Sequence, residues 1–316
     1  MKTLLQIAAA TAALLIVASP LAPWCVAAGN LAQQSQPPAL DQTPLTAEQV
    51  RDLVSLTIEN QHRNDAALDS FERIERQVSH AGSASGPVIE EKTYRVVPTG
   101  SGTLKLLLRA NGQPVSEALY RRQLRDWENI LKVAVNADDP RQIAVLAKQQ
   151  KKMKARAHFI DAARSAFQIT WAGREIRDGR AVEKLQFTPN PSYPTHGDAT
   201  DWLSHARATV WIDPQADQVV SIDATIIRDI SIGAGFLGKI YRGGHFTMQQ
   251  APVAPGIWEP TLYEYDISGR KFLFSFSMHE AISDEHYQLL GLPEQLLDEA
   301  RDNLAHCCDM AAALNP

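Results

Sequence analysis

Cysteine and positive charge are both scarce in this chain of 316 residues. Its three cysteines are too few to build a disulfide-based fold. Its 31 lysines and arginines are outnumbered by 36 aspartates and glutamates, which gives a formal net charge of -5. A protein that binds duplex nucleic acid needs a basic face along many phosphates. We therefore expect no nucleic acid among its partners.

The rest of the composition is that of a folded globular protein. Hydrophobic residues make up 45% of the chain and charged residues 21%, and the mean hydropathy is -0.22. These values argue against global disorder. The length fits one large domain or two small ones.

The first residues have the order of a secretory signal peptide. Lys2 supplies a minimal positive start, and the segment Leu4–Val17 is almost wholly apolar. A membrane-spanning helix needs roughly 20 unbroken apolar residues, and Pro20 and Pro23 come too early for one. We expect cleavage near Ala28 and a periplasmic or secreted protein, with an uncleaved anchor as the alternative.

Periodicity then divides the chain. Thr46 is followed by Gln49 at the spacing of a capping box, and apolar residues recur at helical intervals over 46–64. The parts we expect are a signal peptide over 1–28, a Gln- and Pro-rich flexible leader over 29–45, a single half-barrel domain over 46–290 with a helical insert at about 116–160, and a C-terminal helical tail over 291–316.

The order of the elements predicts the fold class. Helices gather near the front and hairpin-linked strands fill the back, which is typical of an α+β protein. We expect a highly curved antiparallel sheet, a half-open β-barrel, with helices covering its concave side. Leu104–Leu108 and Phe272–Phe276 carry apolar residues on both faces of a strand. Both sides of the sheet should therefore be covered, by helices on one side and by a closed or ligand-filled concavity on the other.

Three motifs resemble known functional sites but lack the surrounding sequence that such sites need. Gly233–Gly238 matches a dinucleotide-binding loop, but antiparallel strands surround it and Gly243 follows too soon for a helix. Gly82–Gly86 lacks the serine position of a nucleophile elbow. The polar group from His279 to His286 lacks paired histidines at helical spacing and is typical of a solvated strand end. We expect no catalytic residue, no metal and no cofactor.

The last two cysteines, Cys307 and Cys308, are adjacent. Four consecutive residues, His306 to Asp309, cannot wrap a tetrahedral metal ion. A vicinal disulfide, pairing with another chain and the reduced state all stay open.

The second half of the chain resembles a known family. The segments that carry the resemblance are Ala206–Pro214, Val219–Asp223, Phe236–Ile240, Gly243–Phe246, Trp258–Thr261 and Ser268–Phe274. In this order they look like the outer-membrane lipoprotein-sorting carriers, the LolA/LolB-like superfamily, and especially its uncharacterised secreted bacterial branch. The resemblance implies a half-open barrel, lidded by helices, that holds acyl chains. No first-half motif matches the arginine that latches the lid of true carriers.

Large apolar side chains of the second half are the candidate ligand contacts. Ordinary core residues are the alternative interpretation for each of them, because large apolar side chains are usually inside whatever the function. The candidates are Trp211, Phe236, Leu237, Phe246, Met248, Trp258, Phe272, Phe274 and Phe276.

We therefore expect an exported, non-catalytic binding protein that holds a lipid or acyl moiety in an apolar cavity, as a lipoprotein carrier or envelope sensor. The alternative is an envelope protein-interaction module with a filled barrel and no lipid. A basic stretch is either a solvated helix face or a site that contacts an anionic surface or an acidic partner. It consists of Lys148, Lys151, Lys152, Lys154 and Arg156.

Overall fold

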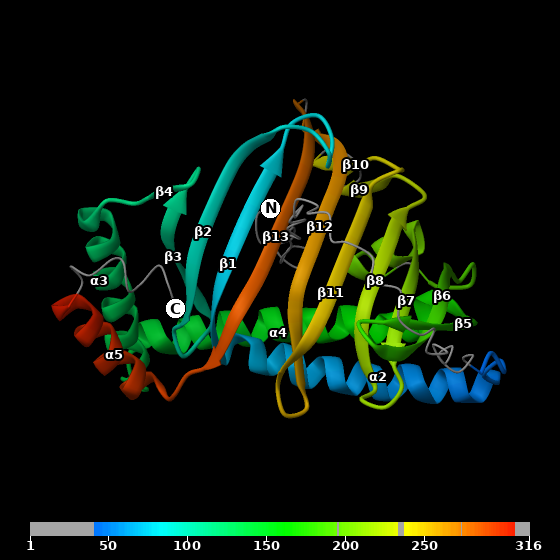
Figure 1. Cartoon of the computed structure of the whole chain (residues 1–316), viewed down its shortest axis with the longest axis horizontal. Helices are drawn as coiled ribbons and strands as arrows, with labels where there is room; N and C mark the ends of the chain where they lie inside the picture. Colours follow the sequence, from blue (N-terminus) through cyan, green and yellow to red (C-terminus); the bar gives the residue numbers. More distant parts are fainter. Residues whose placement is uncertain (1–40, 195, 233–236, 273, 307–316) are drawn as a thin grey trace, which may run out of the picture.

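The structure is a computed structural model that describes residues 41–194, 196–232, 237–272 and 274–306 (Figure 1). The expected signal peptide, its cleavage near Ala28, the candidate contact Phe236 and the cysteine pair lie outside the described residues. Within the described residues, none of the helices has the length and apolar character needed to span a membrane.

The first half of the chain carries most of the helices. Its elements are α2 (Ala47–Ala67), η1 (Leu68–Ser70), β1 (Phe71–His80), β2 (Val88–Pro98), β3 (Thr103–Ala110), β4 (Gln113–Pro114), α3 (Glu117–Ala134), α4 (Pro140–Ala166), β5 (Phe167–Arg177) and β6 (Arg180–Pro189).

Strands dominate the second half. Its elements are η2 (Ala199–His205), β7 (Ala206–Asp213), β8 (Gln218–Ile226), β9 (Ile230–Ile232), β10 (Gly238–Ile240), β11 (His245–Ala254), β12 (Ile257–Lys271), β13 (Phe274–Leu289) and α5 (Pro293–Ala305).

All the strands of the described residues belong to one antiparallel sheet. Its order is β4-β3-β2-β1-β13-β12-β11-β8-β7-β6-β5, with β10 pairing β12 and β9. The path does not return on itself, so the sheet is open and no barrel closes within the described part of the chain. Because β1 pairs with β13, the first and last long strands lie side by side at its centre (Figure 1). The α+β class with a large antiparallel sheet is confirmed.

Local sequence signals set the helix starts. The Thr46 side chain accepts a hydrogen bond from the Gln49 backbone at 3.2 Å, and the Gln49 side chain accepts one from the Thr46 backbone at 2.8 Å. This capping box starts α2 where the spacing predicts it. Asp139 caps α4, and Pro140 stands at its first position, where a missing N–H costs nothing.

Helices α2 and α4 run across the same side of the sheet, which is its concave side (Figure 1). Apolar side chains of α2 form one buried cluster with side chains of β6, β7, β8, β11, β12 and β13. We call this cluster the concave core. Its buried members are Val50, Leu53, Val54, Ile58, Leu185, Phe187, Val210, Ile212, Val219, Met248, Tyr263, Tyr265 and Ile282.

Helices α3 and α5 cover the other face of the sheet, over β2 and β3. Leu106 and Leu108 pack beneath them with Trp127, which is fully buried and donates its indole N–H to the carbonyl oxygen of Pro98 at 2.9 Å. Leu107 is half-buried on the opposite face. Helices therefore cover the face of Leu106 and Leu108, and a cover over the opposite face of this strand stays a prediction.

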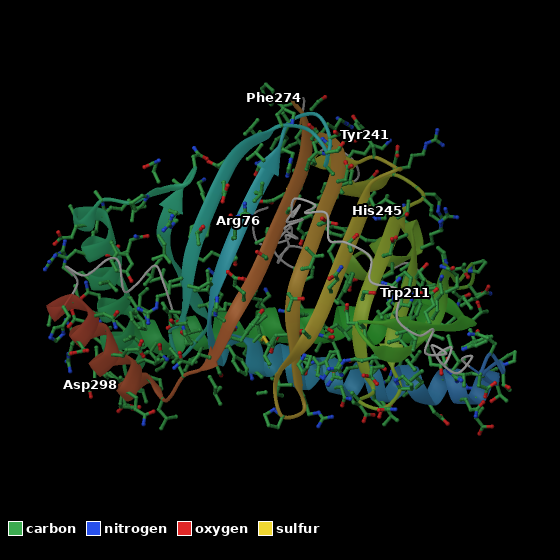
Figure 2. The ribbon with its side chains drawn as sticks, in the orientation of Figure 1. Arg76, Trp211, Tyr241, His245, Phe274 and Asp298 are labelled. Atoms are coloured by element: carbon green, nitrogen blue, oxygen red, sulfur yellow. The ribbon has the colours of Figure 1, made fainter. Side chains whose placement is uncertain are left out.

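The same expectation is wrong for Phe272 and Phe274. Phe272 is 51% exposed and Phe274 is 78% exposed. These residues form the end of the β12–β13 hairpin, where Lys271 pairs with Phe274. Figure 2 places Phe274 at the far tip of the sheet, away from α2 and α4. Apolar composition alone did not reveal that Phe272 and Phe274 lie at a hairpin tip, where both side chains are largely exposed.

Candidate functional site

The concave face changes from apolar to polar next to the concave core. Four buried polar residues lie on four neighbouring strands, in the order β1, β13, β12 and β11. We call them the polar row: Arg73, Asp284, Glu259 and Gln250. In the strand register Gln250 lies opposite Pro260 and Glu259 lies opposite Ala251, next to an irregularity of the β11–β12 pairing. They are 5%, 3%, 1% and 4% exposed, respectively, although charged side chains are almost never so buried without a partner.

Ion pairs neutralise most of the charge in this region. Arg73 Nε lies 3.0 Å from Asp284 Oδ2. Lys105 of β3 pairs with Glu75 of β1, and Arg156 of α4 pairs with Asp65 of α2. In each pair one cation meets one carboxylate. Among the described residues, Glu259 is the buried acid of this region that forms no ion pair.

Burial shifts the pKa values of these acids upward. Burial raises the pKa of Glu259 to about 9, with Arg73 opposing the shift. It raises the pKa of Asp284 to about 7, again against the effect of Arg73. The pKa of Asp65 is also raised by burial, while Arg156 lowers it. Because desolvation disfavours the charged form, Glu259 is a neutral carboxylic acid at neutral pH.

Several atoms of the polar row lack a hydrogen-bond partner among the described residues. They are Arg73 Nη1, Asp284 Oδ1, Glu259 Oε1 and both amide atoms of Gln250. Buried polar atoms are normally paired, and an unpaired one costs about 1–3 kcal/mol. These unpaired atoms include both hydrogen-bond donors and acceptors. They therefore match a bound group that both donates and accepts hydrogen bonds.

Polar contacts hold α4 over this surface. Besides Arg156, Gln149 donates to Asp69, and Asp161 lies 2.9 Å from His62 Nε2. Of the 27 residues of α4, only Gln142, Ala162 and Ala166 are buried. The helix is therefore attached by few buried side chains, through these polar contacts and through Ile160, which packs against the concave core.

The strand end from His279 to His286 differs from the sequence-based interpretation. Glu285 and His286 are exposed, as a solvated strand end requires. Asp284 and His279 are buried, so that interpretation is wrong for these two residues. They are buried because β13 lies at the centre of the sheet, between β1 and β12.

The nine candidate contacts lie in different places. Phe246 and Met248 join the concave core, where the Phe246 ring lies 5.7 Å from that of Tyr263. Trp211 and Trp258 meet in a separate buried cluster. Leu237 is 49% exposed, near the exposed Phe272 and Phe274, whereas Phe276 packs against the cluster of Ile230, Ile240 and Ile267. The structure thus brings together two pairs of the candidates, and their contact with a ligand stays a prediction.

The two tryptophans carry cations on their rings. The Arg177 guanidinium lies 3.6 Å from the Trp211 ring centroid, and the Arg180 guanidinium lies 4.9 Å from that of Trp258. Trp211 also donates its indole N–H to Glu175 at 2.9 Å. These contacts explain the burial of both rings without a ligand.

We expect Arg177→Met to lower the free energy of unfolding by about 0.5–2 kcal/mol, because it removes the cation from the Trp211 ring. Urea denaturation followed by tryptophan fluorescence measures the change. Arg207→Met, at an exposed arginine of β7, is the matched control and should stay within about 0.5 kcal/mol. Equal losses in both variants would contradict a stabilising role for the stacked cation.

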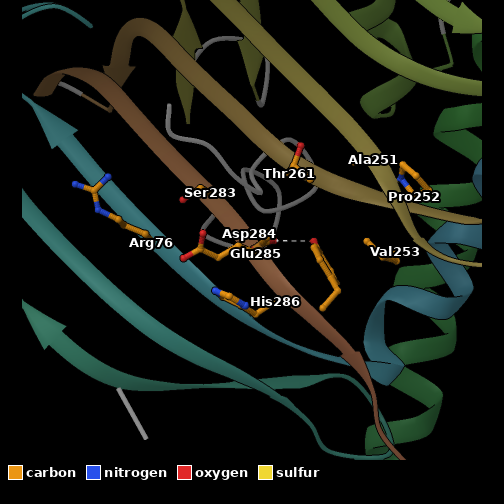
Figure 3. A pocket seen from close by; sticks show the side chains of 10 residues that line it. Arg76, Ala251, Pro252, Val253, Thr261, Ser283, Asp284, Glu285 and His286 are labelled. Atoms are coloured by element: carbon orange, nitrogen blue, oxygen red, sulfur yellow. Dashed lines mark hydrogen bonds between the residues drawn. The ribbon is translucent and has the colours of Figure 1, made fainter. Parts of the chain in front are cut away.

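Two grooves lie outside the concave core. One, of about 580 Å³, has a mixed polar and apolar lining that includes Arg76, Val253, Glu285 and His286 (Figure 3). The other, of about 410 Å³, lies between α3 and α4. None of the nine candidate contacts lines either groove.

Among known proteins, the chain is similar to several solved structures. No protein family and no curated protein sequence matches the chain. A LolA superfamily protein from Nitrosomonas europaea is 11% identical, with 80% of this chain and 97% of that chain covered and a TM-score of 0.30. A putative outer membrane lipoprotein-sorting protein domain from Vibrio parahaemolyticus is 10% identical, with coverages of 79% and 99% and a TM-score of 0.27. A DUF1329 family protein from Desulfovibrio piger is 13% identical, with coverages of 77% and 94% and a TM-score of 0.28.

The descriptions of the first two structures name the superfamily that the sequence resembles. With these TM-scores, the likenesses carry no argument about ligand or mechanism.

Proposed function

We propose that the chain is an exported, non-catalytic protein that binds a lipid or acyl chain on the concave face of its sheet, beneath α2 and α4. The concave core supplies the apolar surface for such a ligand. Burying an acyl chain contributes about 0.8 kcal/mol for each methylene. Phe246 and Met248, two of the candidate contacts, belong to this surface.

The observation that carries the proposal is the attachment of α4. The helix lies over the concave side, yet only three of its 27 residues are buried, and ion pairs join it to α2. A cover held by ion pairs can open without exposing a large apolar area of its own. The apolar surface beneath it then becomes available to a ligand.

Export is the second part of the proposal. The N-terminal sequence has the order of a signal peptide, and we propose a periplasmic or secreted location after its removal. Processing of the N-terminus is checked by mass spectrometry of the protein isolated from the bacterial envelope. An intact Met1 in the isolated protein would contradict cleavage.

Lipid binding is tested by native mass spectrometry and lipid extraction of protein purified from the envelope. We expect a lipid to co-purify, and a fluorescent fatty acid to bind the delipidated protein. If no lipid co-purifies and no fluorescent fatty acid binds, the proposal is wrong.

We expect Asp65→Asn to speed ligand uptake about tenfold, because the ion pair with Arg156 that joins α2 to α4 is worth about 1.4 kcal/mol or more. Stopped-flow fluorescence with a labelled fatty acid measures the rate. Asp52→Asn, at an exposed position of the same helix, is the matched control and should leave the rate unchanged. An unchanged rate in the Asp65→Asn protein would show that this ion pair does not limit the opening of α4.

A second candidate function is a protein-interaction module. The groove between α3 and α4 favours it, because its lining includes the aliphatic residues Ile130, Val133 and Val145. A photo-crosslinker at Val145 that captures one envelope protein reproducibly would support this function over lipid binding.

The basic stretch of α4 is available for contact with an anionic surface. Lys148, Lys151, Lys152 and Lys154 are exposed, whereas Arg156 turns toward Asp65. We propose that the four lysines, without Arg156, form this contact. Co-sedimentation with vesicles containing anionic lipid, compared with neutral vesicles, tests it.

A further inference from the structure

The polar row is continuous with the concave core. Asp284 and Ile282 are two residues apart on β13, in a stretch that pairs with β1 without interruption, and therefore point to the same face, about 7 Å apart along the strand. Ile282 belongs to the concave core, and so does Tyr263, which lies opposite it on β12. A molecule that lies on the concave core would reach the polar row with its other end.

Both helices of the cover also approach the polar row. Asp65 of α2 and Arg156 of α4 lie near enough to influence the pKa of Glu259. The Tyr287 hydroxyl lies 2.6 Å from the Pro260 carbonyl oxygen and 3.2 Å from Asp284 Oδ2, which fixes one oxygen of that carboxyl group. The other oxygen, Asp284 Oδ1, has no partner among the described residues.

The charges of the region disfavour a charged headgroup. Arg73, Lys105 and Arg156 are each paired with a carboxylate, and Glu259 is a further acid without a cation. A buried carboxylate or phosphate would therefore meet no unpaired positive charge, and burying an uncompensated charge is costly. An ammonium group would likewise meet no unpaired negative charge, because the other carboxylates are already paired and Glu259 is neutral at pH 7.

The unpaired atoms favour an uncharged group that both donates and accepts hydrogen bonds. Arg73 Nη1 and Gln250 Nε2 are donors, and Asp284 Oδ1 and Gln250 Oε1 are acceptors. The raised pKa of Glu259 makes its carboxyl group a donor and an acceptor at neutral pH. Hydroxyl groups match this mixed set.

We propose that the polar row is a headgroup site for an amphiphile with an uncharged, hydroxyl-bearing headgroup of the glycerol or sugar type. This inference rests on the proposed lipid-binding function, because the acyl chain of the same ligand occupies the concave core. Glu259, Gln250, Asp284 and Arg73 bind the hydroxyl groups. The site discriminates against free fatty acids.

Three amphiphiles with the same 14-carbon chain test the proposal: monomyristoylglycerol, tetradecyl maltoside and myristate. Each is titrated below its critical micelle concentration against a bound fluorescent fatty acid at pH 7. We expect at least one uncharged amphiphile to bind about tenfold or more tightly than myristate, since one hydrogen bond to a buried group is worth about that factor. Equal affinity for all three would overturn the headgroup site and leave lipid binding intact. No binding of any of them would overturn the proposed function as well.

Substitutions at Glu259 separate recognition from folding. Glu259→Gln keeps an uncharged donor and acceptor and should retain the preference for the uncharged amphiphile. Glu259→Leu should remove that preference while its Tm is unchanged or higher, because it removes a buried, unpaired carboxyl group. Glu264→Leu, at an exposed position of the same strand, is the matched control. An unchanged preference in the Glu259→Leu protein would overturn the inference.

Discussion

Replacing Arg73 with leucine is expected to lower the free energy of unfolding at pH 7 by about 3–5 kcal/mol. Arg73 is the cation that faces Asp284, at 3.0 Å, and both side chains are almost fully buried. Without Arg73, Asp284 would be buried without a compensating charge, so the folded variant must keep a desolvated carboxylate or take up a proton that the unfolded chain does not hold. Removing one partner of a buried ion pair costs far more than the pair contributes, because the remaining charge stays desolvated.

A double variant isolates that cause. Arg73→Leu combined with Asp284→Leu should recover most of the lost free energy of unfolding, since apolar residues of similar volume often replace a buried ion pair at little cost. Guanidinium denaturation of both single variants and the double variant completes the cycle. A double variant as unstable as Arg73→Leu alone would show that packing of the arginine, and not its charge, determines the loss.

The pH dependence of the same variant gives a second check. Burial already raises the pKa of Asp284 to about 7 in the presence of Arg73. Loss of the cation should raise it further, so Asp284 becomes protonated and uncharged in the folded variant. The penalty of Arg73→Leu should therefore be smaller at pH 5 than at pH 8.

Local patterns account for the parts of the fold that the sequence predicted. A capping box and a helical period are properties of neighbouring residues, so the start of α2 at Thr46 could be derived from the chain alone. Turn residues and alternation likewise predicted antiparallel hairpins in the second half. These signals are local, and the antiparallel character of the sheet follows from them.

The polar row could not be predicted in the same way. Arg73 and Glu75 alternate with Glu72 and Ile74, and charged residues in a strand normally indicate a solvated face. They are buried because β13, more than 200 residues away in the chain, pairs with β1, and because α2 and α4 cover that face. One signal was present: Phe71, Arg73 and Glu75 share one face of the strand by their spacing of two.

The candidate ligand contacts show that composition alone does not predict the face of the sheet on which a residue lies. Trp211 and Val210 are adjacent on β7, so they point to opposite faces, and only Val210 belongs to the concave core. A large apolar residue indicates burial, but the choice of face depends on register. Register between distant strands is set by the whole sheet, including the bulge that follows Trp211.

The free energy of unfolding is expected to fall as the pH rises from about 5 to 9. The folded-state pKa of Glu259 is raised from 4.5 to about 9, and that of Asp284 from 3.8 to about 7. The folded protein therefore holds protons that the unfolded chain has released. The stabilisation from these protons is fully present below the unfolded pKa values and is lost as the pH rises through the folded ones.

Each such proton makes the free energy of unfolding fall by up to about 1.4 kcal/mol for each pH unit. Asp139 and Glu175 have lowered pKa values. Their contribution to the free energy of unfolding changes only at pH values below the ordinary pKa of an acid, which lie outside this range. Burial raises the pKa of Glu280 and Glu299 as well, which adds to the slope with the same sign.

The slope between pH 7 and 9 is assigned to Glu259 by a difference measurement. Urea denaturation at several pH values is compared for the native sequence and Glu259→Gln, so that every other titrating group cancels. We expect the glutamine variant to show a flatter profile by about one proton, and Glu264→Gln, at an exposed position, to follow the native profile. Parallel profiles for Glu259→Gln and the native protein would mean that Glu259 is ionised when folded. The polar row would then carry a buried negative charge, and an uncharged hydroxyl headgroup would no longer be the ligand that its atoms favour.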